Sequence, residues 1–263
     1  MTKRFIAKLY ATKLVNPACT LLVIFSVVLT ANASLVAKDV NLESPLGVAL
    51  LSCKQPDSST RTVSLGSVLT TGVEGIDDIV IVAAHGLHTL SEHCSMSFSN
   101  EQLKIKNIQR GQDENAYGDW AVVTLDGRFE GEIQRLPWAT TKADDFSFLV
   151  EDGGTVSMIK RRLSRTVSSC QLHIPTRGLS NPSDRGVVVV SDCSSLPGDS
   201  GAPVFATVDG VVTMIGLNLG YRFDISPSPH EWKPRASIVR LIDKAVESAI
   251  VAAIKQEVIT DRF

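Results

Sequence analysis

The stretch "SSLPGDSGAPVF", Ser194 to Phe205, places a serine among small turn residues. Gly198 and Gly201 bracket Asp199 and Ser200, and glycine permits the tight, positive-φ backbone that residues with a β-carbon avoid. Such a loop can aim backbone N–H groups at one point, where they would stabilise a developing oxyanion. Gly, Asp, Ser and Pro are also ordinary turn residues, so the stretch alone fits a plain loop as well. A nucleophile at Ser200 would therefore need a base and an orienting acid elsewhere in the chain.

The candidate base is His85, in the segment "DDIVIVAAHGL". Residues Ile79–Val82 form a strand-like run, and the two alanines that follow it leave room for an imidazole ring. A lone histidine at a strand end is often only a surface or core residue. His88 and His93 are the alternative bases, but no comparable segment precedes them.

The candidate orienting acid is Asp119, in the segment "YGDWAVVTL". It directly precedes the apolar run Trp120–Leu125, and a carboxylate at the mouth of a buried strand is shielded from water. The alternative is a solvent-exposed residue at a strand end. Asp77, Asp78 and Asp113 lie in more polar surroundings and rank below Asp119.

Short apolar segments separated by polar and glycine-rich turns run from Leu46 to about Gly220. This pattern predicts an all-β fold, either barrels or a sandwich. Residues 129–145, "FEGEIQRLPWATTKADD", are polar and are predicted to link two groups of strands. The C-terminal segment predicts an α-helix, because apolar residues fall on one face at helical spacing. These residues are Ile238, Leu241, Ile242, Ala245 and Ala249.

The N-terminal segment has the layout of a secretory signal peptide. Four basic residues precede the apolar run Leu21–Leu29, and small residues follow it, so we expect residues 1–33 to be removed after Ala33. An uncleaved N-terminal anchor is the alternative. The leader carries basic residues only, so its loss makes the net charge of −2 more negative, which argues against nucleic-acid partners. We expect a secreted or periplasmic protein with no stable membrane insertion after cleavage.

Four of the five cysteines lie outside the leader: Cys53, Cys94, Cys170 and Cys193. An even number in an exported chain predicts disulfides, and sequence order favours Cys53–Cys94 and Cys170–Cys193 among the three possible connectivities. His88, His93 and Cys94 are crowded but lack a nearby fourth ligand, so we predict no metal site and no cofactor.

The segments "VAAHG", "GDWAVVTL" and "LPGDSGAPVF", in this order and behind a signal peptide, resemble the chymotrypsin-like serine proteases, in a compact bacterial-type secreted form. The resemblance implies two six-stranded antiparallel β-barrels, over residues 34–135 and 136–263, and a C-terminal α-helix. It also implies a triad of Ser200 as nucleophile, His85 as base and Asp119 as orienter. The N–H groups of Gly198 and Ser200 would form the oxyanion hole.

The same resemblance implies protein or peptide substrates and a specificity pocket. Ser194 would lie at its floor, and Asn218, Leu219 and Gly220 would form the facing wall, with a one-residue shift possible. A neutral floor favours small uncharged side chains, and acidic side chains are the rival. Departures from the family pattern are Ala202, in place of a second glycine after the serine, and Gly86, in place of a cysteine after the histidine.

Three other functions remain open. The chain could be a catalytically weak or inactive protein that keeps the protease fold for binding. It could be an exported β-rich adhesion or scaffold protein in which the motif residues only form turns. It could also be an esterase, although Pro203 and Val204 continue into a strand rather than the helix that follows the usual esterase elbow.

Overall fold

In the computed structural model of this chain, the described residues are 46–54, 61–87, 93–112, 117–142, 156–161, 167–171, 186–191, 195, 197–208, 211–223 and 234–260. They all belong to the unit Ala37–Phe263. The predicted signal peptide, 1–33, lies outside the described residues. Among the described residues, no helix combines the length and apolar character that crossing a membrane requires.

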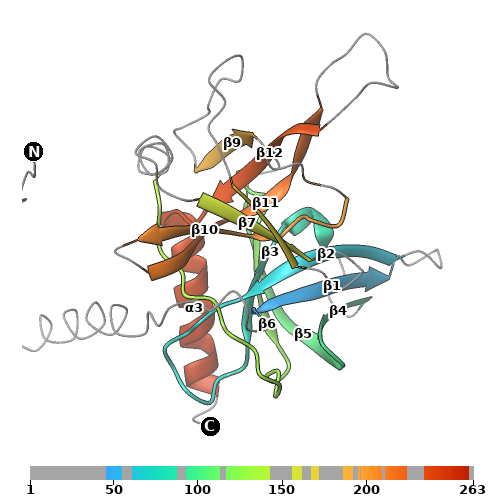
Figure 1. Cartoon of the computed structure of the whole chain (residues 1–263). Coiled ribbons are helices and arrows are strands. Elements are labelled where there is room, and N and C mark those ends of the chain that lie inside the picture. Colours follow the sequence, from blue (N-terminus) through green and yellow to red (C-terminus); the bar gives the residue numbers. More distant parts are fainter. Residues whose placement is uncertain are drawn as a thin grey trace, which may run out of the picture. The chain divides into compact units, whose positions relative to one another are not determined.

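The first six strands form a closed antiparallel barrel (Figure 1). The barrel order is β1-β2-β3-β6-β5-β4, so β1 pairs with both β2 and β4. Its strands are β1 (Val48–Lys54), β2 (Arg61–Val68), β3 (Ile79–Val82), β4 (Cys94–Phe98), β5 (Glu101–Arg110) and β6 (Ala121–Leu125). This barrel confirms the predicted β fold of the N-terminal half.

Strand β3 is buried on both faces, which explains its uninterrupted apolar sequence. Val80 and Val82 belong to the cluster that fills the barrel, whereas Ile79 and Ile81 belong to a second cluster. That second cluster also contains Phe205 of the later strands. The alternation of side chains along one strand therefore gives β3 a part in both cores.

The later strands form one six-stranded antiparallel sheet in the order β8-β7-β10-β11-β12-β9. Its strands are β7 (Val156–Arg161), β8 (Val167–Gln171), β9 (Val187–Ser191), β10 (Pro203–Val208), β11 (Val211–Phe223) and β12 (Pro234–Leu241). Among the described residues no pairing joins β8 to β9. A second closed barrel therefore stays a prediction, as does the boundary between residues 135 and 136.

The C-terminal helix is present, but the prediction placed its start too early. Helix α3 spans Lys244–Thr260 and contacts β6 and β3, whereas Pro234–Leu241, two residues before the helix, form β12. Ile238 and Leu241 therefore belong to a strand that pairs with β9 and β11, and Ala245 is exposed. Asp243 starts the helix, because its Oδ1 accepts hydrogen bonds from the N–H groups of Ala245 and Val246 at 3.0 and 3.1 Å.

The predicted linker is partly buried against both groups of strands. Leu136 is fully buried and forms a parallel bridge with Leu69, next to the barrel. Two residues further on, Trp138 forms a bridge with Met214 in β11, and its Nε1 donates a hydrogen bond to the Thr70 carbonyl at 3.0 Å. This segment therefore packs between the two groups of strands as well as connecting them.

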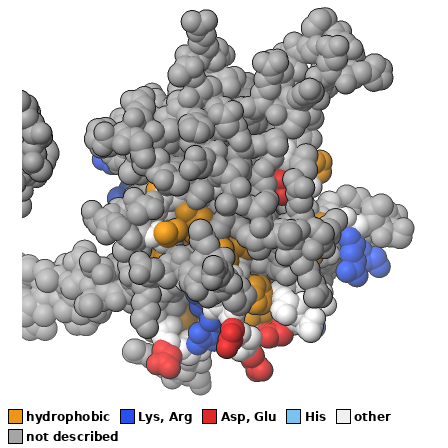
Figure 2. All heavy atoms as spheres, viewed as in Figure 1, with side chains coloured by type: hydrophobic (Ala, Val, Ile, Leu, Met, Phe, Trp, Pro, Cys, Tyr) orange, Lys and Arg blue, Asp and Glu red, His pale blue; other side chains and the backbone are white. Residues whose placement is uncertain are grey.

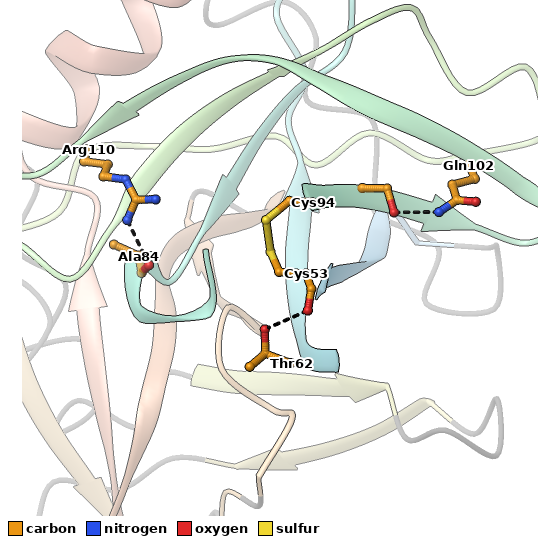
Figure 3. Close-up of a disulfide and its surroundings, with 7 residues drawn as sticks. Cys53, Thr62, Ala84, Cys94, Gln102 and Arg110 are labelled. Atoms are coloured by element: carbon orange, nitrogen blue, oxygen red, sulfur yellow. Dashed lines mark hydrogen bonds between the residues drawn. A yellow bond between two sulfur atoms is a disulfide. The ribbon is translucent and has the colours of Figure 1, made fainter. Parts of the chain in front are cut away.

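A disulfide joins Cys53 to Cys94, which confirms that predicted pairing (Figure 3). The two residues are directly opposite in the β1–β4 ladder, and this ladder is the pairing that closes the barrel between the first and fourth strands. Of the other predicted pair, Cys193 lies outside the described residues and Cys170 is placed only as a backbone position in β8. The Cys170–Cys193 disulfide stays a prediction.

Ion pairs connect elements that are distant in the chain. The Arg135 guanidinium contacts both carboxylate oxygens of the buried Asp78, at 2.7 and 3.0 Å. Lys106 in β5 contacts Asp77 at 2.9 Å and the buried Glu257 of α3 at 2.8 Å.

In the view of Figure 2, described acidic and basic side chains lie next to one another on the lower part of the surface.

Candidate active site

The three residues singled out as nucleophile, base and acid form a continuous hydrogen-bonded chain. His85 Nδ1 lies 2.7 Å from Asp119 Oδ2, and His85 Nε2 lies 2.9 Å from Ser200 Oγ. The other carboxylate oxygen of Asp119 accepts a hydrogen bond from the backbone N–H of His85 at 2.8 Å. The histidine is thus held at both its backbone and its ring.

The pairing of β3 with β6 explains why His85 and Asp119 meet. In this antiparallel pair Val82 lies opposite Ala121, so the end of β3 and the start of β6 share one edge of the barrel. His85 lies in a short 3₁₀ turn, Ala84–Gly86, just after β3, and Asp119 lies just before β6. Residues far apart in the chain therefore reach the same edge through one strand pairing.

Two neighbours restrict the turn that carries His85. The Arg110 guanidinium, from the end of β5, donates a hydrogen bond to the Ala84 carbonyl at 3.3 Å (Figure 3). On the other side, Gly86 packs so closely against Ser64 that a β-carbon at position 86 would overlap the serine hydroxyl. This close packing explains why a glycine follows the histidine.

Ser200 comes from the loop before β10 and is attached to the barrel by its backbone. Its carbonyl accepts a hydrogen bond from the Leu65 N–H of β2 at 2.7 Å. Gly201, with φ of 84°, packs against the same strand, and a β-carbon there would overlap the Leu65 carbonyl oxygen. The glycine after the serine is therefore needed to bring the loop this close to the barrel.

Gly198 and Ser200 each carry a backbone N–H group in the loop around the candidate nucleophile. Gly198 has φ of 96°, a conformation that glycine adopts without strain. Neither the Gly198 nor the Ser200 N–H donates a hydrogen bond to another described residue. These are the two donors that the sequence assigns to an oxyanion hole, and that role stays a prediction.

The environment of His85 raises its pKa. The hydrogen bond to the Asp119 carboxylate is the largest cause, burial lowers the pKa in part, and the negative charge of Asp119 raises it further above the ordinary 6.5. The imidazolium form is therefore stabilised by Asp119, while the neutral ring is the form that can accept a proton from Ser200.

Asn218, predicted as part of the pocket wall, is buried beside the Ser200 loop. Its side chain has no exposed surface, and its amide nitrogen donates to Ser195 Oγ at 2.7 Å and to the Asp199 carbonyl at 2.9 Å. Its Oδ1 accepts a hydrogen bond from the Gly220 N–H at 3.3 Å. These hydrogen bonds make Asn218 a brace of the Ser200 loop, and its predicted place in the pocket wall stays a prediction.

The other three residues predicted to form the pocket differ in how far they are exposed and described. Leu219 is nearly buried, and its carbonyl oxygen lies 3.3 Å from Ser200 Oγ, where it is a second acceptor for the hydroxyl proton. Gly220, with φ of 148°, is partly exposed in β11. Ser194, the predicted pocket floor, lies outside the described residues.

Comparisons with known proteins support the fold alone. The sequence matches no family model and no curated protein. Among solved structures, the chain is similar to one described as the thermostable serine protease AL20 from an extremophilic microorganism, with a TM-score of 0.55 and 12% sequence identity. The similarity covers 81% of this chain and 98% of that one. The chain therefore has a fold like that of a serine protease.

Proposed function

We propose that this protein is an exported serine endopeptidase that hydrolyses peptide bonds in proteins or peptides. The observation that carries the proposal is the hydrogen-bonded chain from Ser200 Oγ through the His85 ring to the Asp119 carboxylate. A protein that only binds has no chemical need for a nucleophile, a base and an orienting acid in this order.

In the proposed mechanism Ser200 Oγ attacks the carbonyl carbon of the scissile bond while His85 Nε2 accepts its proton. Asp119, bonded to His85 Nδ1, keeps the ring in the tautomer whose Nε2 is an acceptor and stabilises the imidazolium that forms. The N–H groups of Gly198 and Ser200 would bind the oxyanion. His85 then protonates the leaving amine, and water releases the acyl group from Ser200 by the same steps.

The finer parts of the proposal concern specificity, export and the second barrel. Ser194 and Gly220 would contact the side chain on the acyl side of the scissile bond, with no fixed charge on Ser194, which favours small uncharged residues. The Cys53–Cys94 disulfide supports an oxidising compartment, in line with removal of residues 1–33 on export. The six later strands are proposed to close into a second barrel.

The test is labelling of the mature protein with a serine-directed fluorophosphonate, together with turnover of a peptide library. We expect stoichiometric labelling at Ser200, and we expect Ser200→Ala to lose both labelling and turnover with an unchanged circular dichroism spectrum. Wild-type-like turnover by purified Ser200→Ala would end the proposal. The absence of labelling in the wild type would instead favour a catalytically inactive binding protein with this fold.

A further inference from the structure

Arg240, in β12, is a buried cation that the reaction described above does not use. It is 2% exposed. Its Nη1 donates to the carbonyls of Gly186 and Leu241 at 3.0 and 2.9 Å, and its Nη2 contacts Asp243 Oδ2 at 2.9 Å. These contacts fix the guanidinium within the sheet of later strands and at the start of α3. A buried charge with so many partners has one defined position.

A further contact of Arg240 reaches the turn that carries Asp119. Its Nε donates to the Tyr117 carbonyl at 2.8 Å, and Tyr117 is two residues before Asp119. The barrel holds the same turn from the other end, because the Gly111 N–H donates to the Trp120 carbonyl at 2.9 Å. Asp119 therefore lies between one anchor from the barrel and one anchor from β12.

The turn and Arg240 both border an open pocket. Tyr117, Gly118 and Trp120 line this pocket of about 520 Å³, and Arg240 and Asp243 line it as well. The hydrogen bond from Arg240 therefore supports the turn at an open part of the surface.

The two groups of strands must keep a constant separation if the triad is to stay assembled, since Asp119 belongs to the first and Ser200 to the second. One link between them is the hydrogen bond from Leu65 in β2 to the Ser200 carbonyl at 2.7 Å. Another is the hydrogen bond from Arg240 to Tyr117. The first link reaches the residue of the candidate nucleophile, and the second reaches the turn that carries the candidate orienting acid.

We infer that Arg240 is a positioning residue for the reaction, which holds the Asp119 carboxylate in register with His85 and Ser200 through the Tyr117 carbonyl. The inference rests on the proposed peptidase function. Arg240 contacts no reacting atom, so its effect passes entirely through the 117–119 turn.

The experiment compares wild type with Arg240→Met and Arg240→Lys. Rates are expressed per fluorophosphonate-reactive site, which removes any loss through unfolded protein. A displacement of the orienting group by about 1 Å costs on the order of 100-fold in rate. We expect Arg240→Met to lose 10- to 100-fold in kcat with KM within about twofold. Arg240→Lys keeps one hydrogen-bond donor and the positive charge beside Asp243. We expect this variant to lose less in kcat and to stay folded, so that its activity can be measured.

The pH profile separates positioning from a merely structural role. Displacing Asp119 weakens its hydrogen bond to His85, so the acidic limb of kcat/KM should move to lower pH in the Arg240 variants. The matched control is Arg135→Lys, which alters another guanidinium paired with a buried carboxylate, Asp78, at the opposite end of β3 from His85. We expect Arg135→Lys to lower the melting temperature while kcat per site and the acidic limb stay at wild-type values.

The outcomes distinguish this inference from the proposed function. Wild-type kcat and an unshifted acidic limb per active site in either folded Arg240 variant would overturn the positioning role while leaving the peptidase proposal intact. The same shift of the acidic limb in Arg135→Lys would also overturn the positioning role. Loss of any guanidinium paired with a buried carboxylate would then alter the pH profile. Absence of Ser200-dependent turnover in the wild type would instead refute the proposed function.

Discussion

Asp119 holds His85 at two atoms, and this double contact sets the chemistry of the candidate site. One carboxylate oxygen accepts from the backbone N–H of His85 at 2.8 Å, and the other lies 2.7 Å from its Nδ1. The first bond fixes the position of the residue and the second fixes the tautomer of the ring. With a proton on Nδ1, the lone pair of Nε2 faces Ser200 Oγ at 2.9 Å. In the proposed mechanism a single acid thereby prepares the base for proton transfer.

The rate should depend on pH through His85. Asp119 raises the pKa of His85 above 6.5, and only the neutral ring accepts a proton, so kcat/KM should fall as the pH drops through that raised pKa. We expect the midpoint of the acidic limb above 6.5 in the wild type. In Asp119→Asn, kcat should fall by roughly 10⁴-fold and the limb should move to lower pH. A wild-type profile that stays flat across the histidine range, about pH 5 to 8, would contradict His85 as the base.

The strands next to His85 and Asp119 could be predicted from local sequence, but the start of the C-terminal helix could not. Ile79–Val82 and Ala121–Leu125 are apolar and short, and the structure has strands at both places. The segment Pro234–Leu241 also shows helical spacing of apolar residues, yet it pairs with a strand on each side. Those partners come from distant parts of the chain, so tertiary pairing overrides the local pattern.

The hydrogen bonds by which Asn218 braces the Ser200 loop could not be predicted from the sequence either, because they too depend on tertiary pairing. Its partners, Ser195 and the Asp199 carbonyl, are about 20 residues away, and only the β10–β11 pairing brings them to the amide. The turn residues of the Ser200 loop could be recognised by type, whereas the contact of Gly201 with Leu65 requires the barrel and the later strands to be placed together. The sequence thus indicated the residues of the hydrogen-bonded chain better than it indicated the residues that support them.

Gly201→Ala tests whether the close approach of the Ser200 loop to β2 is needed. The new methyl would overlap the Leu65 carbonyl oxygen, and φ of 84° is itself unfavourable for alanine. Because the obstacle is backbone, the loop must move away, and we expect activity to fall at least 100-fold. Fluorophosphonate labelling should slow in parallel. Gly72→Ala is the matched control, since Gly72 also has positive φ, at 70°, but has open space where an added β-carbon would lie. Equal effects of the two variants on labelling would contradict the steric argument.

The two groups of strands share a core, and both contribute to the candidate site. Ile81 of β3, Phe205 of β10 and Ile250 of α3 belong to one buried cluster. A protein built this way is expected to unfold cooperatively, because neither group of strands can lose its packing without exposing the shared core. Closure of the barrel then matters to the site, since β3 and β6 carry His85 and Asp119 at its edge.

The disulfide at the closing ladder of the barrel should contribute strongly to stability. Cys53 and Cys94 are 41 residues apart, and crosslinking a loop of that length reduces the conformational entropy of the unfolded chain. We expect the double variant Cys53→Ser/Cys94→Ser to lose about 2–4 kcal/mol in free energy of unfolding. This difference is measured by urea denaturation under oxidising conditions, with unfolding monitored by intrinsic fluorescence.

Reductant supplies the control for that measurement and also tests the remaining cysteine pair. Dithiothreitol should lower the denaturation midpoint of the wild type. In the double variant it should act only if Cys170 and Cys193 form the second predicted disulfide, because no other cysteine remains after cleavage at Ala33. An unchanged midpoint in the double variant without reductant would show that the link across β1 and β4 adds nothing to stability. The barrel would then be closed by its backbone ladder and apolar interior alone.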